Sequence, residues 1–584
     1  MPTLTRPNPM NLRLLTCSVA LALAACGGSD DDGPTTPETP PPATPSDVPT
    51  ISPEVRAAAQ KITVDPTVMA MVQEWSSPAS TQARFDQHME LVRIASPSRF
   101  EMRRAAEIQR RALQEWGFAA TEIKTRADGQ LPGSDVQLVD GLPVYNMCVE
   151  IKGSYSASAG AQAYRGQYPK VLVEGHIDTV NPEVLPPATD PFEPVKLQPI
   201  GQAIVTTPGE LAAIPEQLSF DAAGRIVQDA SYIKARQYFA DETAARNAGA
   251  MRLYVPGISD AMGNTSGVFN LAKAMKKYNI KPVYDMWFCG TAGEEGKGNL
   301  AGMKQLYGYD QNLGTGTNPL NFVTNFSIDG GSGTINFIGS YRFEMKYTAP
   351  TAAGATAPSA LEAAAASIAR IADVKTPWDD DKQALKTTYT VGVVSCEDPA
   401  AGSTVVPSCT VQVDMRSPRL DPLKDIRGRI EPLFQAGVTE ENSRYGVPDN
   451  SAQAVKMELT WFGDRPPHER SNLSDVSIQA AWQSAEVVGV DKLEKLSTAA
   501  SSLNDNVPAA IGVPTINLNI GTFAAGGGGH AFWEWAIPGE SAKEVLRLQR
   551  VLTAALIASG FHATDGSVVA PAAAPLGART AEVK

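Results

Sequence analysis

The chain has 584 residues and a formal net charge of −13, from 63 acidic and 50 basic residues. Hydrophobic residues make up 43% of the sequence, which is ordinary for a soluble globular protein, and the length predicts more than one domain. An acidic chain without a basic cluster argues against nucleic-acid binding.

The N-terminal segment is predicted to be a targeting sequence and not part of the fold. An apolar run over 14–25 follows two arginines; it is too short to span a membrane but suits a signal peptide. The run ends at Leu-Ala-Ala-Cys26, which resembles the lipobox of bacterial lipoproteins, and a plain signal peptide with an incidental cysteine is the alternative. We expect removal of residues 1–25 and lipidation of Cys26. Gly27 does not resemble an inner-membrane retention signal, so the expected place is the outer membrane of the bacterial cell envelope, facing the periplasm, with the lipid as the only membrane contact.

Both ends of the mature chain are predicted to be disordered. Residues 26–52 are rich in proline, threonine and aspartate, a composition that cannot bury a core and is typical of a tether. Globular sequence begins near Pro53. The stretch 564–584 is rich in alanine, proline and glycine and is predicted to be a disordered tail.

The first polar motif follows a short apolar strand over 171–173. Because side chains alternate along an extended strand end, His176 and Asp178 point to the same face, where a carboxylate can fix the tautomer of a metal-bound imidazole. Asp260 lies in the loop before a helix predicted over 266–278. The long connection, about 181–251, carries no metal-ligand pattern and is predicted to be a lid or a surface decoration.

The most informative stretch is Gly-Thr-Ala-Gly-Glu-Glu-Gly over 290–296. It follows an apolar strand, 284–289, so Glu294 and Glu295 lie where a strand ends in a glycine-rich turn. Buried acids are costly without a partner or a metal. A hydrolase can use one carboxylate as a metal ligand and its neighbour as the base that activates water. Taken alone, the pair also fits a solvated acidic loop.

The remaining polar positions follow the same pattern. Asp329 comes after a short strand, 326–328, and His530 follows a run of four glycines, 526–529. Two of the five histidines and several acids thus fall at strand ends or in glycine-rich turns. Such ligands suit zinc, manganese or cobalt, and the absence of cysteine among them argues against a structural zinc site.

The segment between Asp329 and His530 has its own pattern, strand–helix–strand–strand–helix–strand. The strands are predicted over 341–347, 387–395, 410–416 and 454–462, and the helices over 359–374 and 422–436. This order is that of a ferredoxin-like domain.

Four cysteines lie in the predicted globular part. Cys396 and Cys409 bracket the tip of a predicted hairpin, so a disulfide between them is expected in an oxidising compartment. Cys289 is either a buried thiol or the partner of Cys148, and the spacing does not decide between these.

The order His-x-Asp, Asp, Glu-Glu, Asp, His resembles that of the di-zinc exopeptidase family, which includes glutamate carboxypeptidase, peptidase T, aminoacylase, acetylornithine deacetylase and succinyl-diaminopimelate desuccinylase. The resemblance covers about 85–561. The peptidase T-like subgroup is closest, on the motifs at 463–466, 501–502 with 506–508, and 512–514; the stretch 503–505 departs from the subgroup's pattern.

The resemblance implies a role for each residue. By this resemblance, Asp260 would bridge two metals, His176 and Asp329 would complete one metal site, and Glu295 and His530 would complete the other. Glu294 would be the general base, and Asp178 would orient His176. Two divalent ions are implied, with Zn²⁺ first and Mn²⁺ or Co²⁺ as alternatives.

Several positions depart from the family's pattern or lie outside the ligand set. Family members often carry a histidine early in the inserted domain, in a Gly-Gly-His-Ser motif, and the corresponding stretch 347–356 has none. Arg465 and His468 are candidate replacements, although His468 also fits an exposed loop. Asn506 lies in a loop that lines the substrate pocket in the family. Glu534 is expected to contact the preceding ligand, His530, with a surface acid as the alternative.

The predicted fold is therefore α/β: a di-zinc exopeptidase catalytic sandwich with an inserted ferredoxin-like lid or dimerisation domain. The catalytic domain comprises 53–338 and 471–563, and the lid comprises 339–470. A homodimer through the lid is one state that the resemblance implies.

The expected activity is metal-dependent hydrolysis of an amide bond in short peptides or N-acyl amino acids, with exopeptidase action first. Two alternatives stay open: an amidohydrolase of a non-peptide amide, and a non-catalytic binding protein that kept the fold. The intact ligand set argues against the binding protein, and the missing lid histidine argues for it.

Overall fold

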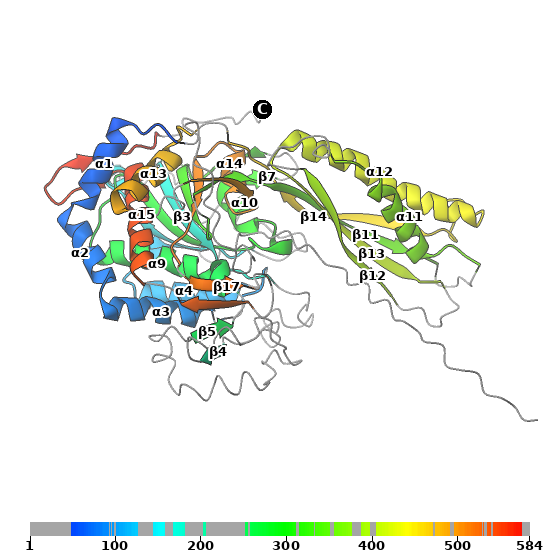
Figure 1. The fold of residues 1–584 in the computed structure, drawn as a ribbon, viewed down its shortest axis with the longest axis horizontal. Helices are drawn as coiled ribbons and strands as arrows, with labels where there is room; N and C mark the ends of the chain where they lie inside the picture. Colours follow the sequence, from blue (N-terminus) through cyan, green and yellow to red (C-terminus); the bar gives the residue numbers. More distant parts are fainter. Residues whose placement is uncertain are drawn as a thin grey trace, which may run out of the picture.

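The structure is a computed structural model with a broad α/β body and an elongated inserted domain (Figure 1). It describes residues 48–92, 94, 96–98, 101–125, 144–157, 168–180, 202–205, 251–254, 257–310, 315–331, 333–350, 356–376, 387–397, 405–470, 473–490, 496–521, 523–527, 530, 534–538 and 541–574. The predicted signal peptide, lipidation at Cys26 and most of the 181–251 insertion lie outside these residues.

The body is built on one eight-stranded sheet. Its strands, in spatial order, are β1 (Ile123–Thr125), β2 (Met147–Ile151), β6 (Asp285–Thr291), β3 (Lys170–His176), β9 (Phe322–Ile328), β16 (Thr515–Leu518), β10 (Thr334–Phe337) and β15 (Ser497–Ser501). The four central strands, β6 to β16, run parallel. Every residue of these four strands is buried, as expected for a parallel sheet covered on both faces.

Helices cover the two faces of the sheet. Alternate residues of β3 show this, because Val171 and Val173 belong to one apolar core and Leu172 to another. The first core is closed by α1 (Pro53–Thr63), α2 (Pro66–Trp75), α3 (Pro78–Val92), α4 (Met102–Gln114), α9 (Gly263–Lys277), α13 (Val476–Val488) and α15 (Ser541–Ser559). The second is closed by α10 (Ala301–Tyr307) and α14 (Asn506–Ala510).

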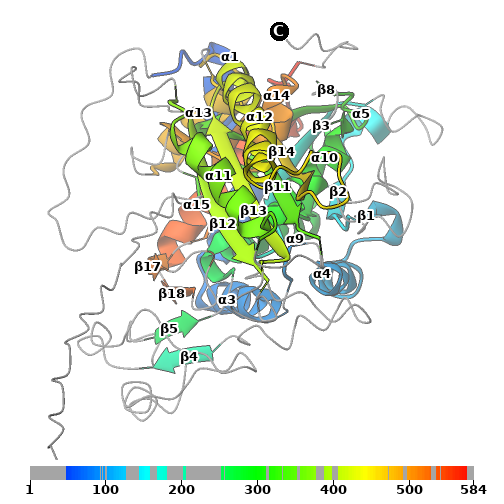
Figure 2. The same ribbon diagram turned by 90° about the vertical axis from the view of Figure 1, so that its right-hand side faces the viewer.

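The inserted domain is ferredoxin-like, as predicted. Its sheet has the order β12 (Thr388–Cys396), β13 (Ser408–Ser417), β11 (Gly339–Thr348) and β14 (Lys456–Arg465), all antiparallel. The helices α11 (Ala360–Ala372) and α12 (Leu420–Arg444) lie together on one face (Figure 2). The predicted fold class, an α/β body with this insertion, is confirmed.

Helix α12 is longer than the sequence predicts. The prediction ends at Ala436, before Gly437, because glycine commonly follows a helix. In the structure the helix continues to Arg444. A Cβ on Gly437 would lie 2.3 Å from the hydroxyl of Ser367 on α11, so this glycine permits close packing of the two helices and does not end the helix.

A second, four-stranded sheet pairs strands from the region of the 181–251 connection with strands near the C-terminal end of the body. Its order is β17 (Phe523–Gly527), β18 (Trp535–Pro538), β5 (Met251–Tyr254) and β4 (Gln202–Val205). Figures 1 and 2 both place β4 and β5 beneath α3, apart from the main sheet. The smaller elements are α5 (Ser154–Ala157), β7 (Tyr309–Asp310), β8 (Thr315–Gly316), β19 (Phe561–His562), β20 (Val568–Val569), and short helical turns at Ala120–Glu122, Ile258–Met262 and Gly296–Gly298.

The predicted disorder over 564–584 is wrong for its first eleven residues, 564–574. β19 and β20 form a hairpin across this position. The carboxylate of Asp65, which also caps α2, accepts hydrogen bonds from the backbone N–H and the hydroxyl of Thr564, at 2.7 and 2.8 Å. This long-range contact orders a segment whose composition alone favours disorder.

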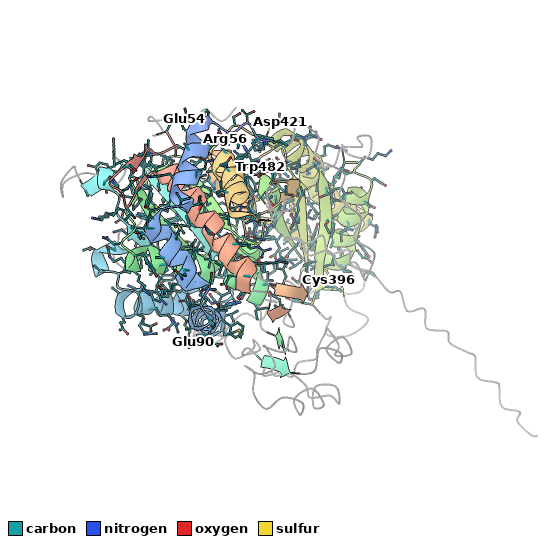
Figure 3. All side chains as sticks on the ribbon, turned by 60° about the vertical axis from the view of Figure 1, so that its left-hand side comes forward. Glu54, Arg56, Glu90, Cys396, Asp421 and Trp482 are labelled. Carbon is teal, nitrogen blue, oxygen red and sulfur yellow. A yellow bond between two sulfur atoms is a disulfide. The ribbon has the colours of Figure 1, made fainter. Side chains whose placement is uncertain are left out.

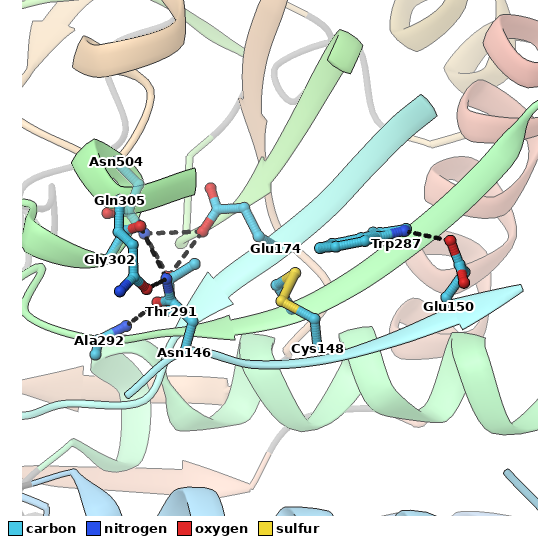
Figure 4. Close-up of a disulfide and its surroundings, with 11 residues drawn as sticks. Asn146, Cys148, Glu150, Glu174, Trp287, Thr291, Ala292, Gly302, Gln305 and Asn504 are labelled. Carbon is cyan, nitrogen blue, oxygen red and sulfur yellow. Dashed lines mark hydrogen bonds between the residues drawn. A yellow bond between two sulfur atoms is a disulfide. The ribbon is translucent and has the colours of Figure 1, made fainter. Parts of the chain in front are cut away.

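Two disulfides lie within the described part of the chain. Cys148 and Cys289 join opposite residues of β2 and β6, so the open alternative for Cys289 is resolved in favour of pairing (Figure 4). Cys396 and Cys409 close the β12–β13 hairpin, as predicted, and Figure 3 shows Cys396 at the outer part of the inserted domain. None of the helices in the described ranges combines the length and apolar composition needed to cross a bilayer.

Candidate metal centre and active site

The predicted site residues meet at the carboxyl ends of the central parallel strands. His176 is the last residue of β3, Asp329 follows β9 directly, and Glu294 and Glu295 lie just beyond β6. Asp260 lies in the turn before α9. Because neighbouring parallel strands end at one edge of the sheet, residues far apart in sequence converge there.

Two histidines and three acids form the centre of the site. His176 Nε2 lies 3.2 Å from an oxygen of Asp260 and 3.2 Å from an oxygen of Asp329. His530 Nε2 lies 3.1 Å from the other oxygen of Asp260 and 3.4 Å from an oxygen of Glu295. The two oxygens of Asp260 therefore face different imidazoles, which is the arrangement of a bridging carboxylate.

The donor set fits a divalent metal site. Ligand atoms of His176, Asp260 and Glu295 all lie within 4.8 Å of one another. Burial, together with the charge of Asp260, raises the pKa of Glu295 to about 8, and burial raises the pKa of Asp329 to about 7. Buried carboxylates held this close repel one another unless cations neutralise them. Imidazole nitrogens with carboxylate oxygens suit zinc, manganese or cobalt.

Asp178 orients two parts of the site. Its backbone carbonyl lies 3.0 Å from His176 Nδ1, and one of its carboxylate oxygens lies 3.4 Å from the same nitrogen. The carboxylate also accepts hydrogen bonds from the backbone N–H groups of Glu294, at 3.0 Å, and Glu295, at 2.8 Å. Asp178 thus holds the His176 ring and the Glu-Glu turn in one arrangement.

A segment for which the sequence predicts no role at the site braces both loops. The Ser98 hydroxyl donates to the Glu295 carbonyl at 2.8 Å, and Glu101 accepts from the Gly293 N–H at 3.0 Å. Arg104, only 1% exposed, donates to the Ile177 carbonyl at 2.6 Å. The one available signal was helical spacing, since Arg104 falls on the same buried stripe of α4 as an isoleucine and an alanine.

The Glu-Glu turn is also supported by Asn146, the residue directly before β2. Asn146 accepts a hydrogen bond from the Ala292 N–H at 2.9 Å and donates to the Gly302 carbonyl at 2.9 Å (Figure 4). The Cys148–Cys289 disulfide lies two residues further along the same pair of strands.

Arg465 reaches the predicted base from the inserted domain. It is the last residue of β14, and its guanidinium donates to a carboxylate oxygen of Glu294 at 3.0 Å and to the Ser502 hydroxyl at 3.1 Å. It also donates to the Glu294 backbone carbonyl. The orientation of Glu294 therefore depends on a residue at the root of the lid.

Asn506 and His468 lie at the hinge of the lid. The Asn506 amide donates to the carbonyls of Ile338 and Pro466, both at 2.8 Å, so it ties together the two chain crossings between the domains. His468 pairs through its backbone with Phe337 and is half-buried, which lowers its pKa to about 4. Among the contacts of the described residues, neither side chain touches a predicted metal ligand.

Glu534 has a different partner from the one predicted. Its carboxylate accepts hydrogen bonds from the Gly257–Asp260 turn and does not contact His530 among the described contacts. The sequence placed it near the metal site through its closeness to His530 along the chain, and the true contact is with a turn over 270 residues away.

A cavity of about 740 Å³ lies elsewhere in the body. Its lining includes Ile151, Lys152, Met275 and His562. None of the predicted site residues lines it, so it is separate from the metal centre.

Comparison with solved structures finds proteins of the same fold. No family model matches the chain, and no curated protein matches it by sequence. A tripeptidase from Staphylococcus aureus superposes with a TM-score of 0.50 at 16% identity, over 82% of this chain and 98% of its own. The chain therefore shares its fold with this tripeptidase.

Other solved structures are similar at lower scores. Human carnosine dipeptidase 1 has 11% identity and a TM-score of 0.48, over 83% of this chain and 98% of its own. A dinuclear metal-binding peptidase of the M20 family from Bacillus subtilis has 12% identity and a TM-score of 0.43, over 83% and 99%.

Proposed function

We propose that this protein is a metallohydrolase that cleaves an amide bond in short peptides or N-acyl amino acids, with exopeptidase action first. The observation that carries the proposal is Asp260, whose two oxygens lie 3.2 and 3.1 Å from the Nε2 atoms of His176 and His530. The proposal is supported by the fold, which the chain shares with a tripeptidase.

The residues divide the work as follows. His176, Asp329, Glu295, His530 and Asp260 would hold two divalent ions, which supply a water of lowered pKa and polarise the substrate carbonyl. Glu294 accepts a proton from the attacking water and passes it to the leaving amine. Arg465 holds one carboxylate oxygen of Glu294, so the base points in a fixed direction. Asp178 fixes Glu294 and His176 relative to each other, because its carboxylate accepts from the Glu294 N–H and lies beside the His176 ring.

One observation keeps a second candidate open. β11 ends at Thr348 without the histidine that the family carries there, which favours a binding protein that kept the fold. An amidohydrolase of a non-peptide amide is the third possibility.

The test is cleavage of a mixed library of dipeptides, tripeptides and N-acyl amino acids by the metal-loaded protein, followed by mass spectrometry. Glu294→Gln is the matched control, since it keeps the shape of the side chain. Cleavage that the control abolishes supports the proposal and identifies the bond. Absence of cleavage by a protein that contains its metals would reject peptide hydrolysis and favour the other two candidates.

We also propose that the protein is anchored at the outer membrane through Cys26 and faces the periplasm. Two disulfides support an oxidising compartment. Mass spectrometry of the mature N-terminal peptide tests this: an acylated Cys26 is expected, and an unmodified chain that retains residues 1–25 would contradict it.

We further propose a homodimer through the lid. β12 is an edge strand of the lid sheet, and Val394 on it is 51% exposed, so it offers backbone groups and apolar surface to a second copy. Light scattering on the protein and on Val394→Lys should show a dimer and its dissociation, respectively; a monomeric wild type would rule the dimer out.

A further inference from the structure

Glu534 is buried against a single turn of the chain. Its side chain is 2% exposed. One oxygen accepts hydrogen bonds from the Ser259 backbone N–H at 2.9 Å, the Ser259 hydroxyl at 2.6 Å and the Asp260 N–H at 3.2 Å. The other accepts from the Gly257 N–H at 2.5 Å. All four hydrogen bonds are accepted by one buried carboxyl group, and leaving such buried donors unpaired is costly, so these contacts fix the turn.

The same turn is held from two more sides. β18 begins at Trp535, directly after Glu534, and pairs with β5, which ends three residues before Gly257. Gly257 has a φ of 79°, and a Cβ there would lie 2.2 Å from the Thr179 side chain. These contacts hold the turn next to β18 and next to the end of β3, where His176 lies.

This arrangement connects two metal ligands that no strand joins directly. Glu534 lies four residues after His530, and its carboxylate binds the backbone N–H of Asp260 itself. Asp260 in turn faces His176 with one oxygen and His530 with the other. A displacement of the Asp260 turn thus changes both positions, and Glu534, four residues after His530 along the chain, is a side chain that holds this turn.

We propose that Glu534 is a positioning residue that couples the two metal positions. An ion held by His176, Asp260 and Asp329 orders the Asp260 turn, and Glu534 transmits this order to the His530 loop, so the second ion binds to a formed site. Coupling of this kind is reciprocal, because each ion then favours the other by the same factor. The inference rests on the proposed two-metal function.

The variant Glu534→Gln removes the charge of the side chain and keeps its size and shape. Glutamine has one acceptor oxygen, so it can serve the Ser259 side of the turn but presents an amide donor to the Gly257 N–H. Ser259→Ala is a milder change, since it removes one of the four donors and leaves the backbone contacts. Glu441→Gln is the control: Glu441 is a fully buried acid of the lid that accepts from the Ser359 N–H at 3.1 Å, far from the ligands.

The experiment titrates the metal-free full-length protein with Co²⁺ by calorimetry. Wild type should take up two ions, the second no more weakly than the first. In Glu534→Gln the second ion should weaken by about 10- to 100-fold, with a smaller change for the first. Ser259→Ala should shift in the same direction by less, and Glu441→Gln should match wild type.

A second measurement does not depend on the metal. Amide hydrogen exchange of the metal-free protein should show faster exchange of peptides that cover 257–260 in Glu534→Gln, with the sheet strands unchanged. A Glu534→Gln isotherm equal to that of wild type, or equal weakening of both ions, would overturn the coupling while leaving the proposed function standing. A wild type that binds fewer than two ions would instead refute the proposed function itself.

Discussion

The two disulfides offer a quantitative test of how the body and the lid are stabilised. The Cys148–Cys289 bridge spans 141 residues of sequence, and the Cys396–Cys409 bridge spans 13. In the loop-entropy model, a bridge restricts the unfolded chain more when the loop is longer. The model gives a stabilisation of about 5 kcal/mol for the long loop and about 3 kcal/mol for the short one. The double variant Cys148→Ala/Cys289→Ala should therefore lose about 2 kcal/mol more than Cys396→Ala/Cys409→Ala.

Hydrogen exchange with peptide-level resolution is the suitable assay, because the two domains need not unfold together. Peptides of β2 and β6 report the first variant, and peptides of β12 and β13 report the second. The same substitution type in both pairs makes each variant the control for the other. Equal losses, or a larger loss in the lid, would refute the argument from loop length.

Three further predictions follow from the site and its surroundings. Glu294→Gln should keep both metals, since Glu294 is not among the predicted ligands, yet lower the turnover number by at least about 100-fold; unchanged turnover would exclude it as the base. His530→Ala should lose about one metal equivalent by elemental analysis, and full occupancy would show that His530 is not a ligand. Burial lowers the pKa of His88, whose Nε2 lies 3.1 Å from the Ile258 carbonyl, to about 4. As pH drops, the unfolded chain therefore binds a proton at this histidine before the folded chain does. The free energy of unfolding should fall by up to about 3 kcal/mol as pH drops from about 6.5 to 4. In urea unfolding curves, His88→Gln should lose this part of the pH dependence.

The sequence predicts the parts of this protein whose signals are local. Strand ends with polar residues mark the positions of His176 and Asp329, and the glycine-rich turn marks Glu294 and Glu295. The order of strands and helices along the chain predicts the ferredoxin-like insertion, although its central strand β11 pairs with the distant β13 and β14 and not with β12. The disulfide of the β12–β13 hairpin follows from the same short-range reasoning.

The rest depends on contacts between distant segments, which composition and spacing do not encode. Glu534 was assigned to His530, its neighbour in sequence, whereas its four hydrogen bonds go to the turn before α9. Arg104 and Ser98 brace the ligand loops through backbone carbonyls, which carry no side-chain signature. Asp65 orders Thr564 across almost the whole chain, and Gly437 continues α12 because a helix packs against it.

The central claim is that Asp260 lies between two metal ions. Anomalous diffraction from crystals of the zinc-loaded protein tests it most directly. We predict two zinc peaks, about 3.5–4 Å apart, one beside His176 and Asp329 and the other beside His530 and Glu295, with one oxygen of Asp260 bound to each. A single peak, or two peaks that Asp260 does not bridge, would contradict the account.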